Sequence, residues 1–445
     1  MKQNRFVVSV FLLALNTWCS AQDLQYSTNR TSGVSVALNG VATGGGPNVV
    51  AVGTNSAVSM GSVGANGLSF ASNEVSKTAL NLTALAYGNG MFVAGATNGA
   101  LFTSADGAGW TTGGSAFASQ NDLGGLAFNS GSNGTFVAVA DGIPLIRWAD
   151  AQLAQWHTAL ISSGGLAEFY YGVTALPATN TRFAVCGFGG VIRLSQDAGR
   201  TWTVAGANSY HQSSPTLTGI ASGGGKLVCV GTGGRTMVSS DGGTNWTSIN
   251  PVTANLNGVA YTGSGFIAVG DGGLILSSPD GAVWTRQSSQ TTRNLYGVAF
   301  ALSGPLQGVA VVVGAKGTLL VGGAIPLQPT SLGNQMNTYG AENPPLSVSV
   351  ANNEPSGAVT VDWFDANSNP VAVGTSTFTP TNRFPVGTYV YYAQARDTRT
   401  EFTNATRTAM SLTITPAPLV ITANAQTKAY GAALPALTVS SLALR

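Results

Sequence analysis

Charged residues are scarce in this sequence. Only 8% of its 445 residues are Asp, Glu, Lys or Arg, whereas about a quarter is typical of globular proteins. Disorder is excluded, because 44% of the residues are hydrophobic. A coiled coil is excluded as well, since its repeats require abundant Glu and Lys. With 19 basic and 17 acidic residues, the chain also lacks the excess of positive charge that nucleic-acid binding needs.

Histidine and cysteine are almost absent. His157 and His211 are the only histidines, and the three cysteines show no spacing typical of a metal site. A phosphate-binding loop motif is missing too. We therefore expect neither a metal nor a cofactor. Long apolar runs are also lacking after the N-terminus, so we predict no integral membrane helix.

The N-terminus has the features of a secretory signal peptide, residues 1–21. Lys2 and Arg5 precede an apolar run of about ten residues, and Cys19 and Ala21 supply small residues before a cleavage site. The sequence thus predicts an exported protein, secreted or displayed at the cell surface.

Glycine, with 59 copies, bounds a set of short repeated segments. The clearest copy runs through Leu256–Tyr261, Gly265–Gly270, Gly273–Ser277 and Ser278–Trp284. Its first two segments recur seven times, each as a short apolar run typical of a β-strand. The repeats therefore predict seven β-sheet units.

A turn with one aspartate and one tryptophan closes four of these units. Ser195, Asp197, Gly199 and Trp202 define the pattern S-x-D-x-G-x-x-W. The residues that we assign to the four turns are Asp106, Trp110, Asp197, Trp202, Asp241, Trp246, Asp280 and Trp284. A carboxylate here can accept hydrogen bonds from backbone N–H groups of its own turn. We interpret the aspartates as turn-forming residues and not as catalytic acids.

This turn resembles the Asp-box (BNR-type) repeat of β-propellers. The whole run, residues 22–325, resembles the propeller family that includes photosystem II assembly factors. The resemblance implies an all-β fold with a seven-bladed propeller. The last repeat lacks a fourth strand, so we predict that Leu24–Thr28 supplies it and closes the ring.

The composition changes after Ile325. Alternating segments in residues 326–416 predict a β-sandwich, and Val361–Asp365 with Gly387–Arg396 resembles bacterial immunoglobulin-like modules, with Trp363 in the core. Residues 417–445 resemble the start of an MBG-type module of adhesin-like proteins. We expect that module to be incomplete, so that the chain is truncated at its C-terminus.

The loops that join successive units predict a binding surface. They contain aromatic and charged residues of the kinds that dominate protein interfaces. The candidate ligand-binding residues are Glu168, Tyr170, Tyr171, Tyr210, His211, Arg293 and Tyr296. An alternative is that the aromatic residues after Glu168 simply begin a strand and face the core.

Three functions are open at this point. We favour a non-enzymatic, monomeric protein that binds a glycan or a protein at the cell surface. A carbohydrate-active hydrolase resembling sialidases is the second, although the repeats contain only two glutamates, Glu74 and Glu168, for a chemistry that usually needs two opposed carboxyl groups. An assembly or stability factor for a membrane complex is the third.

Two cysteines remain beyond the signal segment. Cys186 and Cys229 occupy the second segments of neighbouring repeats, in positions that predict opposite sheet faces. Stacked sheets would bring them together. A disulfide is permitted in an exported protein, and a pair of buried free thiols is the other possibility.

Overall fold

The computed structural model describes residues 24–442, except 28–29, 45, 47, 65–66, 76–78, 118–120, 132–133, 163–167, 177–181, 207–214, 352–357, 428–429, 434 and 437. The predicted signal peptide, residues 1–21, lies outside the described residues. The described residues divide into two compact units: the first extends to Ile325 and includes Thr398–Phe402, and the second contains the other described residues from Pro326 onward.

The first unit consists of antiparallel sheets that follow one another along the chain. Sheet 1 contains β2 (Leu38–Thr43), β3 (Asn48–Gly53), β4 (Ala57–Gly64) and β5 (Gly67–Glu74). Sheet 2 contains β6 (Leu82–Gly88), β7 (Met91–Ala96), β8 (Ala100–Ser104) and β9 (Thr111–Ser115). Sheet 3 contains β10 (Leu123–Asn129), β11 (Thr135–Ala140), β12 (Ile146–Asp150) and β13 (His157–Thr158).

The next three sheets repeat the same order. Sheet 4 contains β15 (Tyr170–Ala175), β16 (Phe183–Gly187), β17 (Ile192–Ser195) and β18 (Thr201–Val204), with β14 (Leu160–Ile161) added as a parallel fifth strand beside β18. Sheet 5 contains β19 (Leu217–Gly223), β20 (Lys226–Gly231), β21 (Thr236–Ser239) and β22 (Thr247–Ile249). Sheet 6 contains β23 (Leu256–Tyr261), β24 (Phe266–Gly270), β25 (Ile275–Ser278) and β26 (Thr285–Gln287).

Sheet 7 joins the two ends of the unit. It contains β27 (Leu295–Phe300), β28 (Ala310–Gly314), β29 (Leu319–Ala324) and β1 (Leu24–Tyr26). Strand β1 pairs antiparallel with β29, with Leu24 opposite Ala324 and Tyr26 opposite Gly322. The prediction that the N-terminal segment supplies the missing outer strand is confirmed by this pairing.

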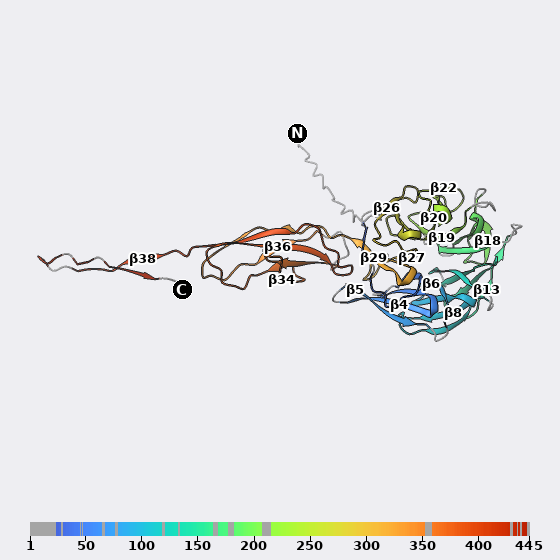
Figure 1. The fold of residues 1–445 in the computed structure, drawn as a ribbon, viewed down its shortest axis with the longest axis horizontal. Coiled ribbons are helices and arrows are strands. Elements are labelled where there is room, and N and C mark those ends of the chain that lie inside the picture. Colours follow the sequence, from blue (N-terminus) through green and yellow to red (C-terminus); the bar gives the residue numbers. More distant parts are fainter. Residues whose placement is uncertain are drawn as a thin grey trace, which may run out of the picture. The chain divides into compact units, whose positions relative to one another are not determined.

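The first strands of the sheets contact one another in chain order, and β27 contacts β2. Strands β6, β19 and β27 lie near the centre of this unit, whereas β13, β18 and β22 lie at its periphery (Figure 1). Among the described residues, the order of contacts is therefore cyclic.

The second strands lie within the core on both faces. In β3, Val50 and Val52 pack against sheet 2, whereas Val49 and Ala51 pack against sheet 7. Because another sheet covers each face of such a strand, water reaches neither face. This explains why these segments are continuous apolar runs and do not alternate apolar with polar residues. Each fully buried valine contributes roughly 1.5–3 kcal/mol of transfer free energy.

Short 3-10 turns connect most second strands to the third strands. They are η1 (Thr54–Ser56), η2 (Thr97–Gly99), η3 (Phe188–Gly190), η4 (Thr232–Gly234), η5 (Asp271–Gly273) and η6 (Ala315–Gly317). None of the helices in the described ranges is long and apolar enough to span a membrane.

The second unit contains two sheets with one shared core. The smaller consists of β30 (Thr330–Ser331), β32 (Leu346–Ser349) and β35 (Thr377–Phe378). The larger consists of β31 (Gln335–Thr338), β37 (Thr408–Thr415), β36 (Gly387–Asp397), β33 (Val359–Phe364) and β34 (Pro370–Ala372). A separate hairpin pairs β38 (Val420–Ala423) with β39 (Val439–Leu442).

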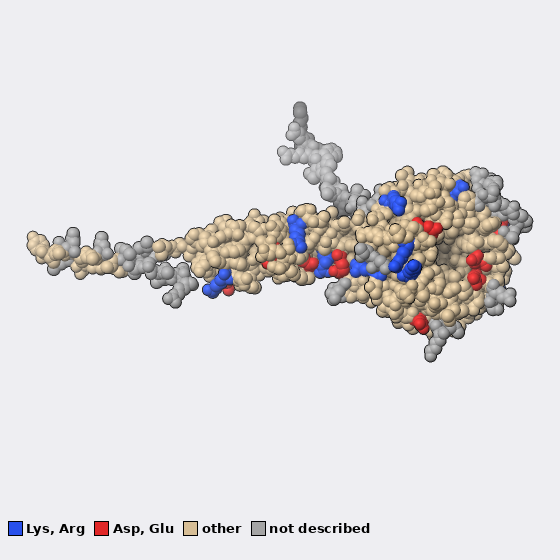
Figure 2. All heavy atoms as spheres, viewed as in Figure 1, with Lys and Arg blue, Asp and Glu red and all other residues tan. Residues whose placement is uncertain are grey.

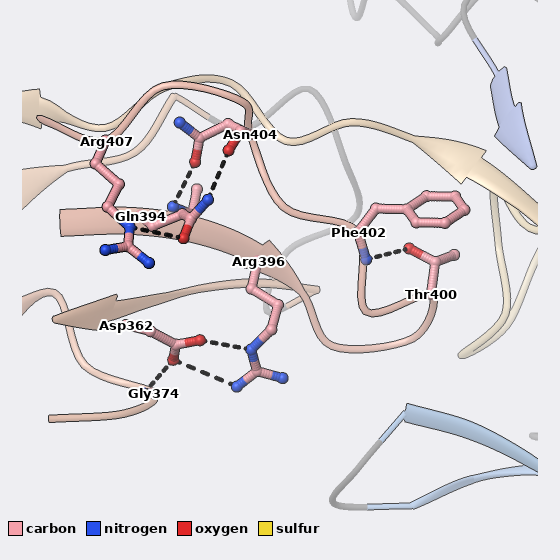
Figure 3. Close-up of polar contacts among 9 residues, drawn as sticks. Asp362, Gly374, Gln394, Arg396, Thr400, Phe402, Asn404 and Arg407 are labelled. Carbon is pink, nitrogen blue, oxygen red and sulfur yellow. Dashed lines mark hydrogen bonds and ion pairs between the residues drawn. The ribbon is translucent and has the colours of Figure 1, made fainter. Parts of the chain in front are cut away.

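Trp363 lies at the centre of this second core. Its side chain is fully buried, and its indole N–H donates to the carbonyl of Thr375 at 2.8 Å. Beside it on the sheet, Arg396 forms an ion pair with Asp362 at 2.7 Å (Figure 3). The placement of Trp363 agrees with its prediction as the core tryptophan.

Candidate binding rim

One end of the first unit carries a repeated β-bulge. In each sheet the first strand shifts register between its first and third residues, which leaves the second residue bulged. The bulged residues are Asn39, Thr83, Gly124, Tyr171, Thr218, Asn257 and Tyr296. We call this end, together with the turns between second and third strands, the rim.

Four bulged side chains reach the neighbouring sheet. Each donates a hydrogen bond to the carbonyl of the first residue in the next first strand. The bonds run from Asn39 to Leu82 at 2.9 Å, from Thr83 to Leu123, from Thr218 to Leu256 at 2.6 Å and from Asn257 to Leu295 at 2.8 Å. They connect sheets 1 and 2, 2 and 3, 5 and 6, and 6 and 7.

A second set of hydrogen bonds connects the same four pairs of sheets. The central N–H of a turn donates to the Asn or Asp side chain that precedes the next first strand. The bonds run from Asn55 to Asn81 at 3.4 Å, from Asn98 to Asp122 at 3.0 Å, from Gly233 to Asn255 at 2.9 Å and from Gly272 to Asn294 at 2.9 Å.

Both kinds of bond are missing at the other three junctions among the described residues. The bulged residues there are Gly124 between sheets 3 and 4, Tyr171 between sheets 4 and 5, and Tyr296 between sheets 7 and 1. Gly124 has no side chain, and a phenol is too large to repeat the short contact that Thr or Asn makes. These two tyrosines were predicted from sequence, and the structure places them at equivalent positions of the rim.

Sheet 4 presents aromatic side chains at the rim. Phe188 begins turn η3, where other sheets carry Thr, Asp or Ala, and it is 39% exposed. Its ring centroid lies 5.9 Å from that of the half-buried Phe169, at an interplanar angle of 54°. The half-buried Tyr171 follows two residues after Phe169.

Two exposed carboxylates flank these aromatic residues on sheet 3. The backbone N–H of Asp141 donates to the carbonyl of Asp122 at 2.8 Å. Partial burial, followed by the negative charge of Asp122, raises the pKa of Asp141. Burial raises the pKa of Tyr171 as well, and the negative charge of Asp141 adds to this effect.

Positive charge lies elsewhere on the rim. The exposed Arg293, just before sheet 7, donates from Nη1 to the carbonyl of Lys316 at 3.2 Å. On the face shown in Figure 2, Lys and Arg side chains lie over the region of β27 and near β22 and β26, and Asp and Glu side chains lie towards β13 and β18 and near β20. The loop Arg286–Arg293 also lines a shallow depression of about 810 Å³.

Glu168 and Tyr170 are buried, contrary to their prediction as ligand-binding residues. Glu168 forms an ion pair with Arg193 at 2.6 Å and accepts a hydrogen bond from the Tyr170 hydroxyl at 2.6 Å. The exposed fractions are 4% for Glu168, 1% for Arg193 and 0% for Tyr170. A charge removed from water requires such partners, so these residues are corrected to structural ones.

This buried cluster fixes the entry to sheet 4. Arg193 also donates from Nη1 to the carbonyl of Ser162 at 2.9 Å, so it binds residues on both sides of the undescribed segment 163–167. Because Phe169 and Tyr171 follow directly, the ion pair positions the aromatic residues of the rim. Tyr210 and His211, the remaining predicted ligand-binding residues, lie outside the described residues.

The four aspartate turns connect third and fourth strands, at the end opposite the rim. In one of them, Asp241 Oδ1 accepts the backbone N–H of Asn245 at 2.9 Å, and Ser239 Oγ donates to the same oxygen at 2.8 Å. Gly243 has a φ of 96°, and the indole of Trp246 donates to its carbonyl at 3.0 Å. Hydrogen bonds from Asn245 lower the pKa of Asp241 to about 2.

The other three turns have the same arrangement. In each, the tryptophan indole donates to a glycine carbonyl at 2.9 Å. The serine hydroxyl also donates to the aspartate in each turn, and the pKa of each aspartate is lowered. A carboxylate held ionised by its own turn is poorly suited to act as a general acid.

Cys186 and Cys229 lie together in the core between sheets 4 and 5. Both thiols are free and fully buried. Burial, followed by the hydrogen bond with Cys186, raises the pKa of Cys229 well above its ordinary value. No group of three or more potential metal ligands gathers in the part of the chain that the structure describes.

Comparisons with known proteins identify the fold. No family model matches the chain, and a search of curated proteins finds no match either. The structure of YCF48 bound to a D1 peptide is similar, with a TM-score of 0.52, 14% identity, and coverage of 68% of this chain and 95% of that chain. YCF48 from Cyanidioschyzon merolae is also similar, with a TM-score of 0.50, 14% identity, and coverage of 67% and 98%.

A second kind of propeller matches as well. The WD40 propeller domain of Doa1 has a TM-score of 0.53 and 10% identity, with coverage of 67% of this chain and 96% of that chain. The first unit therefore has a β-propeller fold. At these identities the similarity concerns the fold alone.

Sequence reasoning missed Phe188 and Asp141 as parts of the rim. Both follow directly after a second strand, at Gly187 and Ala140. An alignment of the seven repeats on the end of the second strand would have revealed Phe188 as the one aromatic residue at that position.

Proposed function

We propose that this is a non-enzymatic binding protein whose propeller has seven blades, one for each sheet, and binds a polypeptide partner at its rim. The observation that carries the proposal is the asymmetry of the rim. Four junctions have repeated polar bonds between sheets, whereas Tyr171 and Tyr296 replace those bonds at two others. Partly exposed aromatic residues at positions where the other repeats form structural hydrogen bonds are typical of interaction sites.

The chemistry of the described residues supports binding over hydrolysis. Glu168 is one of the two glutamates in the repeats that could serve as a catalytic acid. Its carboxylate accepts hydrogen bonds from Arg193 and Tyr170. Retaining and inverting glycosidases both need two carboxyl groups facing a substrate. The aspartates of the four turns lie at the opposite end and are engaged locally.

The similar proteins support a protein partner. YCF48 was seen with a D1 peptide, and WD40 propellers share the fold. We propose that this chain is exported by its N-terminal segment and acts at the cell surface. We further propose that its second unit is an immunoglobulin-like sandwich, followed by an MBG-like module that extends the protein from that surface. A role as an assembly factor would use the same rim.

Selection of a random dodecapeptide display library on the immobilised full chain tests this function. We expect wild-type protein to enrich peptides that the Tyr171→Ala, Tyr296→Ala double variant no longer enriches. As a matched control, Val283→Ala removes an exposed apolar side chain at the opposite end, where Val283 is 63% exposed. Enrichment of no peptide, or equal enrichment by both variants, would contradict binding at the rim.

A further inference from the structure

The aromatic residues of sheet 4 and the carboxylates of sheet 3 form one continuous part of the rim, which we call the aromatic–acidic sector. It contains Phe169, Phe188, Tyr171, Asp122 and Asp141. The backbone N–H of Phe188 donates to the carbonyl of Phe169 at 2.9 Å, and that of Asp141 donates to Asp122 at 2.8 Å. Both pairs thus sit at the same end of their sheets.

Gly124 connects the two halves of the sector. A Cβ atom built on this glycine would lie 2.8 Å from the carbonyl oxygen of Tyr170, 3.4 Å from the backbone nitrogen of Asp141 and 3.6 Å from the Cα atom of Tyr171. Glycine is therefore required for the close approach of sheets 3 and 4 at this point. Because Asp141 N and Tyr171 Cα both lie within 4 Å of that one point, the backbones of Asp141 and Tyr171 run close together here.

Charge in this sector lacks an internal counterion. Neither Asp122 nor Asp141 forms an ion pair within the described part of the chain, unlike Glu168 with Arg193 and Asp362 with Arg396. A partly exposed apolar pair beside two carboxylates without an ion-pair partner is complementary to an apolar side chain next to a cationic one. The phenol face of Tyr171 can also attract a cation.

The geometry of the aromatic pair favours a peptide side chain over a sugar. The rings of Phe169 and Phe188 are tilted by 54° and form an angled apolar surface instead of a flat platform. Neither ring carries a polar group that could pair with sugar hydroxyls. An aliphatic side chain can contact both rings at once.

We infer that the aromatic–acidic sector recognises a polypeptide segment in which an aliphatic residue neighbours Arg or Lys. The aliphatic side chain packs on Phe169 and Phe188, and the cation lies between Asp141 and Tyr171. This inference rests on the proposed function, because it names the chemistry of the partner at the same rim.

Charge reversal at Asp141 gives the most direct test. The dodecapeptide library is selected on wild-type full-length protein, and the peptide with the strongest enrichment is synthesised with its cation as Arg and as Glu. Wild-type protein should bind the Arg form at least tenfold more tightly in fluorescence anisotropy at low salt. Asp141→Lys should reverse this order, whereas Glu74→Lys, an equal charge change at an exposed residue of sheet 1, should leave it unchanged.

Phe188→Ser tests the apolar half. We expect at least a tenfold loss of affinity for the Arg peptide, whereas Leu160→Ser should have no effect because that exposed leucine lies outside the sector. Thermal melting of each variant checks that it is folded.

The outcomes separate the two proposals. If wild-type protein enriches no peptide but binds a glycan array, the proposed polypeptide function fails. If peptides are enriched without an aliphatic–basic pair, or if Asp141→Lys and Phe188→Ser bind them unchanged, the rim binds peptides but the inference about this sector is wrong.

Discussion

At the scale of single residues, the buried ion pair of Glu168 and Arg193 should be costly to break. Glu168→Gln leaves the guanidinium buried without a counter charge, so we expect a loss of about 3–5 kcal/mol in the free energy of unfolding. Urea denaturation measures this free energy. The Glu168→Leu, Arg193→Met double variant should lose less free energy of unfolding than Glu168→Gln, because the double variant buries no charge.

The aspartate turns should make stability depend on acid pH. The folded pKa of Asp241 is about 2, below the unfolded value of about 3.9. Its contribution is therefore complete above pH 4 and is lost as the pH falls towards 2. Calorimetry should show that Asp241→Asn melts below wild type at pH 5, with the difference shrinking towards pH 2. A difference that stays constant over this range would contradict the role of the ionised carboxylate.

The sequence predicted the residues of these turns better than those of the rim. Ser239, Asp241 and Trp246 bond within eight residues of chain, so their spacing alone indicates the turn. Glu168 and Arg193 are 25 residues apart and meet only through the register of β15 to β17. A local pattern carries no information on such a pair, which explains why Glu168 was predicted to be a surface residue.

At the scale of strands, β1 is a structural part of sheet 7. Leu24 is 2% exposed and belongs to the core between sheets 6 and 7. We expect Leu24→Ala to cost about 2–5 kcal/mol in urea denaturation. Leu160→Ala removes the same atoms from a leucine that is 72% exposed and should change stability by less than about 0.5 kcal/mol. Equal effects of the two variants would show that β1 contributes nothing to the core.

The bulge of β15 offers a direct comparison between stability and binding. Thr83 and Thr218 bond to the next sheet from the position that Tyr171 occupies in sheet 4. Tyr171→Thr should therefore supply the missing bond and add about 0.5–1.5 kcal/mol of stability while weakening peptide binding.

Thr218→Val is the reciprocal change, since it removes a bond of 2.6 Å to Leu256. Thr218→Val should lower the free energy of unfolding by about as much as Tyr171→Thr raises it, and it should leave peptide binding at Tyr171 intact. Thermal melting and anisotropy measured on both variants check the pair. A Tyr171→Thr variant that loses stability would mean that the tyrosine itself holds sheets 4 and 5 together.

At the scale of the whole propeller, the cyclic contacts predict that the sheets unfold together. Cys186 and Cys229 are fully buried between sheets 4 and 5, and the raised pKa of Cys229 further suppresses its thiolate. An aromatic disulfide reagent should therefore react with these thiols only in molecules that have unfolded. Unfolded protein that has not been reduced should release two equivalents of aromatic thiolate from the reagent. Release of none would instead reveal a disulfide between the two.

Leu24→Ala then reports whether distant sheets are coupled. The substitution lies in sheet 7, far along the ring from the thiols, yet it destabilises the same cooperative unit. If opening is global, a loss of at least 2 kcal/mol raises the rate of thiol reaction by about 30-fold or more. If sheets 4 and 5 open on their own, Leu24→Ala leaves that rate unchanged although the urea midpoint falls. The ring would then consist of separately opening sectors, because the closure at β1 would stabilise its neighbours alone.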